Sequence, residues 1–283
     1  LTWVRDNWDG WMDLRKMLNI YWAAGQAQAD GITWIGALDP DELIVAGMAD
    51  SFSPGSLDAL LSGISEQADQ VKMINLDAVP ATATSPHPFG AHDLFLGRFP
   101  VAEQLWRYSR FVVRKLLRSP VAEAWYDQLY FQALLRRGFP RVMRHPVTRR
   151  VIPTGYFLSY FNGKSFVRTS RIAKMRPLIH YWKPLPGQGV KTVHAGMVLH
   201  YDLIDANQFM HKFRQRPDTT FVRGLYTRWM IGTMARDLPE EQVHEFFRES
   251  VVISSPQRQK ELISRGVLHR IGSVADFFGR APG

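Results

Sequence analysis

Residues 32–43 of the chain read ITWIGALDPDEL, and this stretch decides the predicted fold. Its first seven residues form an almost continuous apolar run of strand length, which is typical of a central strand covered on both faces of a sheet. The run ends abruptly in Asp39-Pro40-Asp41-Glu42, so three carboxylates directly follow a buried strand. Open α/β folds bind ligands at the carboxyl ends of their strands. We therefore predict an α/β protein with an acidic ligand site at the end of this strand.

Helix and strand signals on both sides of this stretch predict a sheet flanked by helices. Apolar residues recur at three- and four-residue spacing in the helical segments, and Asn162-Gly163 predicts a hairpin across residues 156–168. The density of Pro, Gly and Thr predicts a loop over residues 77–100. The other predicted elements are helices over residues 11–28, 57–65, 205–214, 219–235 and 240–249 and strands over 71–76 and 194–201.

Two basic amphipathic helices are predicted in the middle of the chain, over residues 101–118 and 121–137. Their arginines would suit the headgroups of an anionic membrane, with aromatic side chains such as Trp106 entering the interface. The alternative is a pair of amphipathic helices that pack on the protein's own core. Both interpretations stay open at this point.

The composition limits the class of protein and its partners. With 283 residues, of which 46% are hydrophobic, the chain can bury a sizeable core. The absence of cysteine excludes disulfides and thiolate metal sites, and it favours a reducing compartment. The 35 Lys and Arg against 26 Asp and Glu suit an anionic partner, which can be nucleic acid, an acidic membrane or a phosphorylated substrate. We expect a cytoplasmic protein without membrane-spanning segments, and a peripheral position at the inner face of the membrane is one of the two interpretations of its basic helices.

Three groups of residues are candidates for binding and chemistry. The Asp-x-Asp of Asp39 and Asp41 supplies the oxygens that a divalent cation needs when it bridges diphosphate oxygens, although a solvated turn or a helix cap is the alternative. His200 ends an apolar strand, where it is either a further metal ligand or a structural side chain. Lys164 and Arg168 can meet phosphates, unless they belong to a solvated hairpin. His180 is a further candidate for cofactor binding, because the aromatic pair Tyr181-Trp182 beside it can stack on a base or a sugar.

The order of these pieces resembles the glycosyltransferase family 2-like proteins, including the related family 92 group. The resemblance covers roughly residues 14–216, and its specificity lies in the combination. It implies a GT-A-like domain over residues 1–216, built on a mixed sheet flanked by helices, with a helical insertion over about 101–150. A helical C-terminal region would follow over 217–283. The matching pieces are a helix, W-x-x-x-L-D-x-D-E, Gly55-Ser56-Leu57, a strand, a long loop, G-K-S-x-V-R, and L-H-Y followed by F-x-x-K.

The resemblance also implies roles for single residues. Asp39 would lie near the nucleotide ribose or the metal, Asp41 would bind the metal, and Glu42 would support the loop or the acceptor side. Residues 163–168 match the family's G-K-x-x-x-R stretch, and His200 matches its late His-Tyr. The implied cofactors are a divalent metal, Mn²⁺ or Mg²⁺, and a nucleotide-sugar donor, a UDP-sugar.

Two departures from the family pattern have consequences. The family's opening Asn-Glu strand and its Asp-x-x-S/T-x-D segment are not visible, so we expect an N-terminally incomplete nucleotide-binding half, with an unpaired sheet edge and poor stability. The loop over residues 77–100 lacks the expected tryptophan and glycine pattern, although Phe89-Gly90 matches part of it.

The predicted reaction is an inverting hexosyl transfer to a glycan or a lipid-linked acceptor. The metal, with Lys164 or Arg168, would stabilise charge on the departing diphosphate while a carboxylate deprotonates the acceptor hydroxyl. Asp93 is the candidate base, with Asp77 and Glu42 as alternatives.

Two rival functions stay open. Arginines interleaved with aromatic residues also suit a nucleic-acid-binding protein or a metal-dependent nuclease, although the acidic cluster at residues 39–42 would repel nucleic acid. The second rival is a truncated chain that binds its ligands without catalysing a reaction.

Overall fold

The structure is a computed structural model that describes residues 12–46, 56–85, 89, 91–97, 109, 112–113, 115–116, 120–136, 142–144, 149, 151–153, 163–202, 204–214 and 235–272. The chain forms two compact units, each made from two separate stretches of sequence. The first unit comprises Leu1–Asn75 and Tyr160–His200, and the second comprises Leu76–Ser159 and Tyr201–Gly283. Helices and strands are mixed along the chain, so the predicted α/β class is confirmed. The predicted domain boundary after residue 216 falls inside the second unit.

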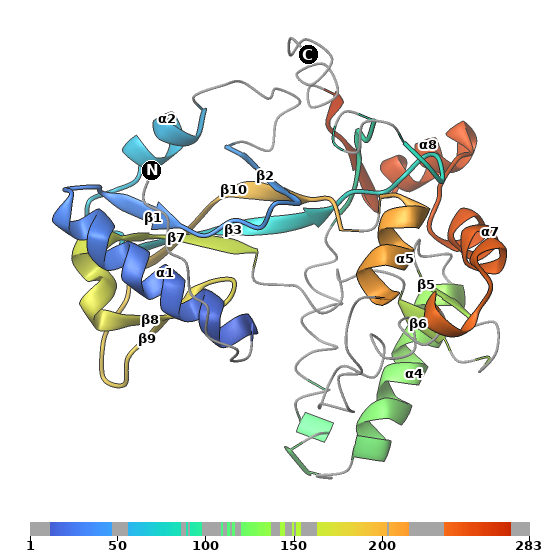
Figure 1. Cartoon of the computed structure of the whole chain (residues 1–283), viewed down its shortest axis with the longest axis horizontal. Helices are drawn as coiled ribbons and strands as arrows, with labels where there is room; N and C mark the ends of the chain where they lie inside the picture. The colour runs from blue at the N-terminus through green and yellow to red at the C-terminus, as the bar shows by residue number, and fades with distance from the viewer. Residues whose placement is uncertain are drawn as a thin grey trace. The chain divides into compact units, whose positions relative to one another are not determined.

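The first unit is built on a five-stranded sheet with the strand order β1-β7-β3-β10-β2 (Figure 1). The last two residues of β3 belong to the second unit. The elements described in this unit are α1 (Met12–Ala29), β1 (Trp34–Gly36), β2 (Glu42–Val45), α2 (Ser56–Ser62), β3 (Gln70–Asp77), β7 (Lys164–Arg168), the 3-10 helix η2 (Thr169–Lys174), β8 (Met175–Pro177), β9 (Trp182–Pro184) and β10 (Thr192–His200).

The strand directions bring several chain ends to one edge of this sheet. Both β1 and β3 pair antiparallel with β7, and β10 pairs antiparallel with β2. The first residues of β3 and β10 lie together, because the backbone N–H groups of Asp69 and Gln70 both donate to the carbonyl of Lys191. Hence β3 and β10 run parallel and the sheet is mixed. We call the edge where β1, β3 and β10 end and where β7 and β2 begin the carboxyl edge.

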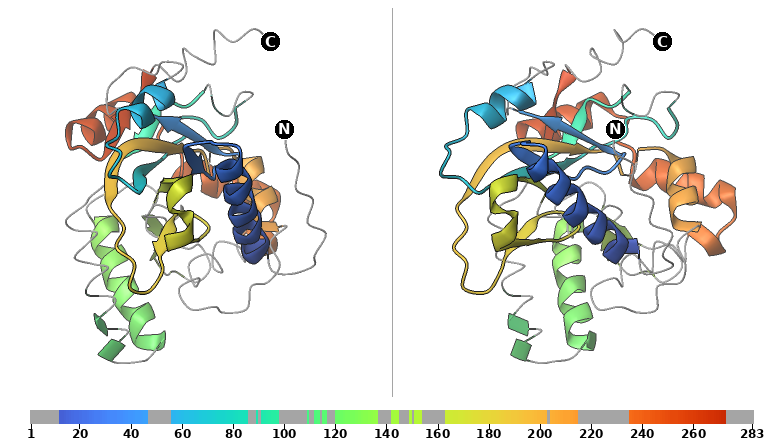
Figure 2. Two further views of the ribbon diagram at one scale, coloured as in Figure 1. Left: turned by 90° about the vertical axis from the view of Figure 1, so that its left-hand side faces the viewer. Right: turned by 60° about the vertical axis from the view of Figure 1, so that its left-hand side comes forward.

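Alternating side chains cover both faces of the sheet. Ile35 and Val167 face the cluster that includes Ala24 of α1, whereas Trp34 and Phe166 face the cluster that includes Leu57 of α2. Figure 2 shows α1 and α2 on opposite faces of the sheet. The period-two alternation of these strands therefore gives the unit a three-layer core.

The predicted central position of the strand in residues 32–38 was wrong. In the described part of the chain, β1 stands at one end of the strand order, and its three residues are half-buried. The strand is apolar because helices cover both of its faces. Such cover does not require a neighbouring strand on each side. The almost completely buried central strand is β3, which was predicted over residues 71–76.

Other predicted elements have mixed outcomes. The helix over residues 11–28 is confirmed as α1, and the strand over 194–201 is confirmed as β10. The loop over residues 77–100 contains a short strand that was not predicted, because Leu94–Leu96 pairs with a C-terminal strand. The first half of the predicted hairpin and most of the helices over residues 101–118 and 219–235 lie outside the described residues.

The second unit combines helices with short strand pairs. Phe209 of α5 and Phe247 of α7 meet in one apolar core, and β4 pairs antiparallel with β11 in another. Among the described residues, none of the helices has both the length and the apolar character to cross a membrane. The elements described in this unit are β4 (Leu94–Leu96), α4 (Pro120–Arg136), β5 (Val142–Arg144), β6 (Val151–Pro153), α5 (Ala206–Arg214), α7 (Glu240–Ser250), α8 (Pro256–Ser264) and β11 (Leu268–Arg270).

Candidate functional site

The acidic loop lies at the carboxyl edge of the first unit. The chain leaves β1 at Gly36 and enters β2, at the other end of the strand order, at Glu42, so the loop between them crosses this edge. The loop is closed on itself, because the backbone N–H of Asp39 donates to Glu42 Oε2 at 2.8 Å and the Asp39 carbonyl accepts from the Glu42 N–H at 3.1 Å. The Asp-x-Asp-Glu sequence thus forms a fixed turn.

A buried lysine binds two of the three carboxylates. Lys164 Nζ lies 2.6 Å from Asp39 Oδ2 and 3.1 Å from Glu42 Oε2, and the lysine side chain is only 1% exposed. Lys16 of α1 binds the other carboxylate oxygen of Asp39. Both oxygens of Asp39 are therefore engaged by lysines, in an alternating chain of charges.

Gly163 is the reason why Lys164 can stand so close to the loop. It has a φ of +52°, and a Cβ atom at this position would lie 1.8 Å from the carbonyl oxygen of Met73 in β3. Only glycine combines this backbone conformation with such a close approach. In the Gly163-Lys164 pair, the glycine thus permits the close backbone approach and the lysine places a buried cation beside the loop.

The pKa of Asp39 reflects its two lysine partners. Burial alone would raise it, but the hydrogen bonds from Lys16 and Lys164 and the charges of these lysines outweigh burial and lower the pKa to about 2. Asp39 therefore stays ionised at all physiological pH values.

Asp41 and His200 form a second, different pair on the same edge. The register places His200 opposite Glu42 in the β10–β2 ladder, and His200 Nε2 lies 3.7 Å from Asp41 Oδ2. A carboxylate and an imidazole at this separation suit a shared divalent ion such as manganese. The structure thus brings together two of the three predicted metal ligands, whereas the third, Asp39, faces lysines.

His180 belongs to the same charged surroundings. It lies in the turn between β8 and β9, which is closed by a hydrogen bond from the Leu178 N–H to the Tyr181 carbonyl. Burial, and then the charges of Lys164 and Lys16, lower the pKa of His180 to about 3. Its imidazole is therefore neutral. Trp182, a member of the predicted stacking pair, is instead packed in the core cluster that includes Ala24 of α1.

Arg168 lies at the other end of β7 from Lys164, away from the carboxyl edge. Its guanidinium donates to the carbonyls of Ala68 and Ser65 and stacks on the ring of Trp34 at 4.3 Å. These contacts tie β7 to the chain that follows α2. The predicted phosphate ligands Lys164 and Arg168 are thus not brought together.

The remaining candidate base lies in the second unit. Asp93 pairs with Arg270 at 2.8 Å, which links the segment before β4 to β11. Another carboxylate of this unit, Asp202, follows His200 by two residues, is buried and pairs with Lys212. Asp77, the alternative base, is also buried.

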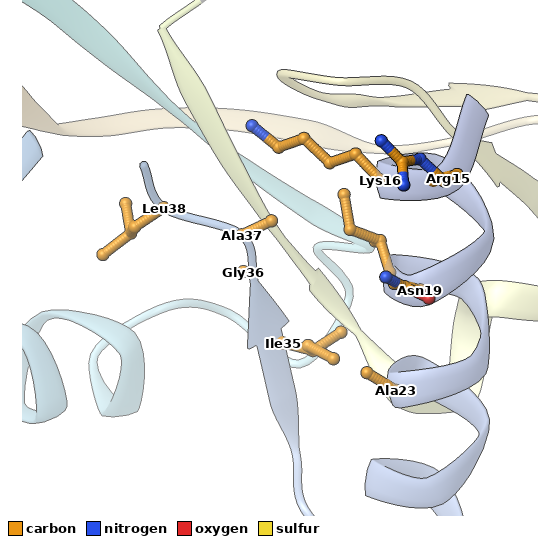
Figure 3. A pocket seen from close by; sticks show the side chains of 9 residues that line it. Arg15, Lys16, Asn19, Ala23, Ile35, Gly36, Ala37 and Leu38 are labelled. Atoms are coloured by element: carbon orange, nitrogen blue, oxygen red, sulfur yellow. The ribbon is translucent and has the colours of Figure 1, made fainter. Parts of the chain in front are cut away.

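A pocket of about 480 Å³ lies beside the acidic loop, between α1 and the chain of β1. Arg15, Lys16 and Asn19 of α1 make it polar on one side, and Ala23 and Ile35 make it apolar further along. Figure 3 shows the Lys16 side chain extending from α1 toward the segment that contains Ala37 and Leu38. This contribution of α1 was not predicted. The available signal was the Arg-Lys pair on the helix that directly precedes the strand and its acidic loop.

No family model, curated protein or solved structure matches this chain. The class of protein is therefore defined by the molecule itself, as a mixed α/β protein. In its first unit, carboxylates, lysines and histidines gather at the carboxyl edge of the sheet.

We expect His180 to make the stability of the protein sensitive to acid. Its folded pKa of about 3 lies below the ordinary histidine value of 6.5, so its contribution to stability is complete above pH 6.5 and is lost as the pH falls toward 3. Urea unfolding at about pH 7 and about pH 5 should show a loss that is up to about 2 kcal/mol larger in wild type than in His180→Gln, which keeps only the loss from other groups such as buried His92, whose pKa burial also lowers. His194→Gln, a change at an exposed histidine of the same unit, is the control and should retain the wild-type loss. Equal losses in wild type and His180→Gln would contradict the assignment.

Proposed function

We propose that the protein is a metal-dependent glycosyltransferase that transfers a sugar from a UDP-sugar to a hydroxyl group of a glycan or a lipid-linked acceptor. The observation that carries this proposal is the Asp39–Glu42 turn at the carboxyl edge. Its Asp41 faces His200 at 3.7 Å, and a pocket with a cationic side lies next to it. A nucleotide-sugar enzyme needs these features together, because it must hold a diphosphate and stabilise that group as it departs.

Asp41 and His200 would hold the metal ion. When bound, a divalent ion at this position would neutralise charge on the diphosphate leaving group. The donor set fits such an ion, because His200 is at the end of β10 and its Nε2 faces the Asp41 carboxylate. The lysines on Asp39 make that carboxylate a support for the loop.

The two lysines have different parts in this proposal. Lys16 is 27% exposed at the pocket, so it can exchange its contact with Asp39 for a contact with a phosphate of the donor. Arg15 and Asn19 on the same helix would add a second cation and an amide. Lys164, by contrast, is enclosed by Asp39 and Glu42 and acts as a positioning residue for the turn.

Glu42 supports the turn in this proposal. Its side chain has no exposed surface, accepts one hydrogen bond from the Asp39 N–H and contacts Lys164. These contacts stabilise the loop that presents Asp41. Asp93 stays the predicted base, and an inverting reaction stays the predicted outcome.

Calorimetric titration with UDP and UDP-sugars, with and without manganese, tests this function. Wild-type protein should bind in a metal-dependent manner, and Asp41→Ala and His200→Ala should each weaken binding at least about tenfold, because each removes a metal ligand. Asp58→Ala, a change at an exposed acid on α2, should bind like wild type. Folded wild-type protein that binds none of these nucleotides would refute the proposal.

A further inference from the structure

Almost all of the net positive charge of the protein lies in one stretch that the proposed function does not use. Residues 101–150 contain eleven Lys and Arg against three Asp and Glu, in a chain with 35 against 26. The other parts of the chain therefore contain 24 against 23 and are nearly neutral. Such an asymmetry points to an anionic partner for this stretch.

Contacts with a neighbouring hairpin fix which face of α4 is turned inward. The Gln128 side chain donates to the carbonyl of Val151 at 2.8 Å and accepts from the Val151 N–H at 3.0 Å. It thus satisfies both backbone groups of Val151. Phe131 is buried against the same residue of β6. The face of α4 that carries Gln128 and Phe131 is thus occupied by the β5–β6 pair.

The opposite face of α4 exposes a stripe of apolar side chains. Trp125 is 67% exposed and Leu129 is 49% exposed, and the exposed Ala133 and Arg136 follow at helical spacing. Leu116, in the segment before α4, is 74% exposed. Large apolar side chains gathered on one face in this way indicate an interaction surface.

We propose that this face of α4, which we call the α4 stripe, docks on an anionic lipid bilayer. Trp125 and Leu129 would enter the interface, where an indole ring and an aliphatic side chain both leave water. The cations would meet the lipid headgroups. Exposed basic residues described in this stretch are Lys115, Arg136, Arg144 and Arg149.

A bilayer fits the α4 stripe better than a single-stranded nucleic acid does. Bases bind to proteins by stacking on aromatic rings, and among the side chains of the stripe only Trp125 offers a ring. Leu129 and Ala133 are aliphatic, and they gain by burial in hydrocarbon. The charge of the stretch attracts either partner, so the aliphatic residues decide between them.

Sedimentation with lipid vesicles tests the proposal. The full chain should bind vesicles that contain phosphatidylserine and phosphatidylcholine, and it should bind phosphatidylcholine alone at least about tenfold more weakly. The double change Trp125→Ser and Leu129→Ser should reduce binding to the mixed vesicles at least about tenfold. Arg136→Gln should reduce it about fivefold, and added salt should weaken the remaining binding.

Matched controls separate this surface from other exposed apolar residues. Tyr21→Ser, a change at a 55% exposed aromatic on α1 in the first unit, should bind vesicles like wild type. All the changed side chains are exposed, so circular dichroism should show folded variants.

Vesicle binding that is absent, or that is unaffected by the double change, would overturn the proposal. Salt-sensitive binding of single-stranded RNA without vesicle binding would assign the surface to nucleic acid instead. These outcomes are independent of nucleotide-sugar binding.

Discussion

Gly163→Ala should destabilise the protein by about 3 to 5 kcal/mol, the largest effect we expect from a single methyl group. The new Cβ would lie 1.8 Å from the Met73 carbonyl oxygen, which is a backbone atom and cannot turn aside. The φ of +52° adds strain for any residue with a side chain. Relief requires β7 to move away from β3 at the pair Met73–Lys164, which would also draw Lys164 out of the acidic loop. Urea unfolding measures the change.

Gly187→Ala provides a matched control in the same unit. Gly187 has a φ of +76°, but a Cβ atom there would find no other atom within 4 Å. This change therefore carries the conformational penalty without the collision, and should destabilise by about 1 kcal/mol. Similar losses in the two variants would show that the close approach of Gly163 to Met73 does not restrict the site.

Lys164→Met should destabilise the protein by about 3 to 5 kcal/mol, because it leaves the fully buried Glu42 carboxylate without its cation. Methionine keeps most of the volume, so the loss reports charge and hydrogen bonding. A double change with Glu42→Gln should recover more than about 1 kcal/mol of the loss, since the unpaired charge is then absent. Chemical unfolding of the two single variants and the double variant gives this coupling free energy.

Lys16→Met is the corresponding control at the other lysine of the chain of charges. Lys16 and Asp39 are both partly exposed, and Asp39 keeps Lys164, so this change should destabilise by about 1 kcal/mol or less. In the proposed function it should weaken UDP binding, whereas its effect on folding stays small. A loss of stability equal to that of Lys164→Met would contradict the distinction between a positioning lysine and a ligand-binding lysine.

Local sequence predicted much of the first unit, because its signals are local. An apolar run that ends in acids, a glycine before a lysine and a histidine at a strand end each have a meaning within a few residues. Their convergence on one edge depends on strand directions, which no local pattern specifies. The strand of residues 164–168 illustrates the difference, since its spacing cannot tell which of Lys164 and Arg168 lies at the site.

The parts that sequence analysis missed depend on contacts between distant segments. Lys16 looks like an ordinary surface lysine of an amphipathic helix, and only the fold brings it to Asp39, which lies 23 residues along the chain. The edge position of β1 was missed for a similar reason. Helices on both faces of a strand produce the same apolar pattern as a place in the middle of a sheet.

The position of β10 in the sheet has a consequence for biosynthesis. This strand lies between β3 and β2, yet it is the last of the five to leave the ribosome. About 120 residues separate the end of β3 from the end of β10, so at about 5–20 residues per second translation needs roughly 6 to 25 s to supply it. During that interval β2 waits without the neighbour that it has in the described fold. The nascent chain therefore exposes an unpaired strand edge until β10 has been synthesised.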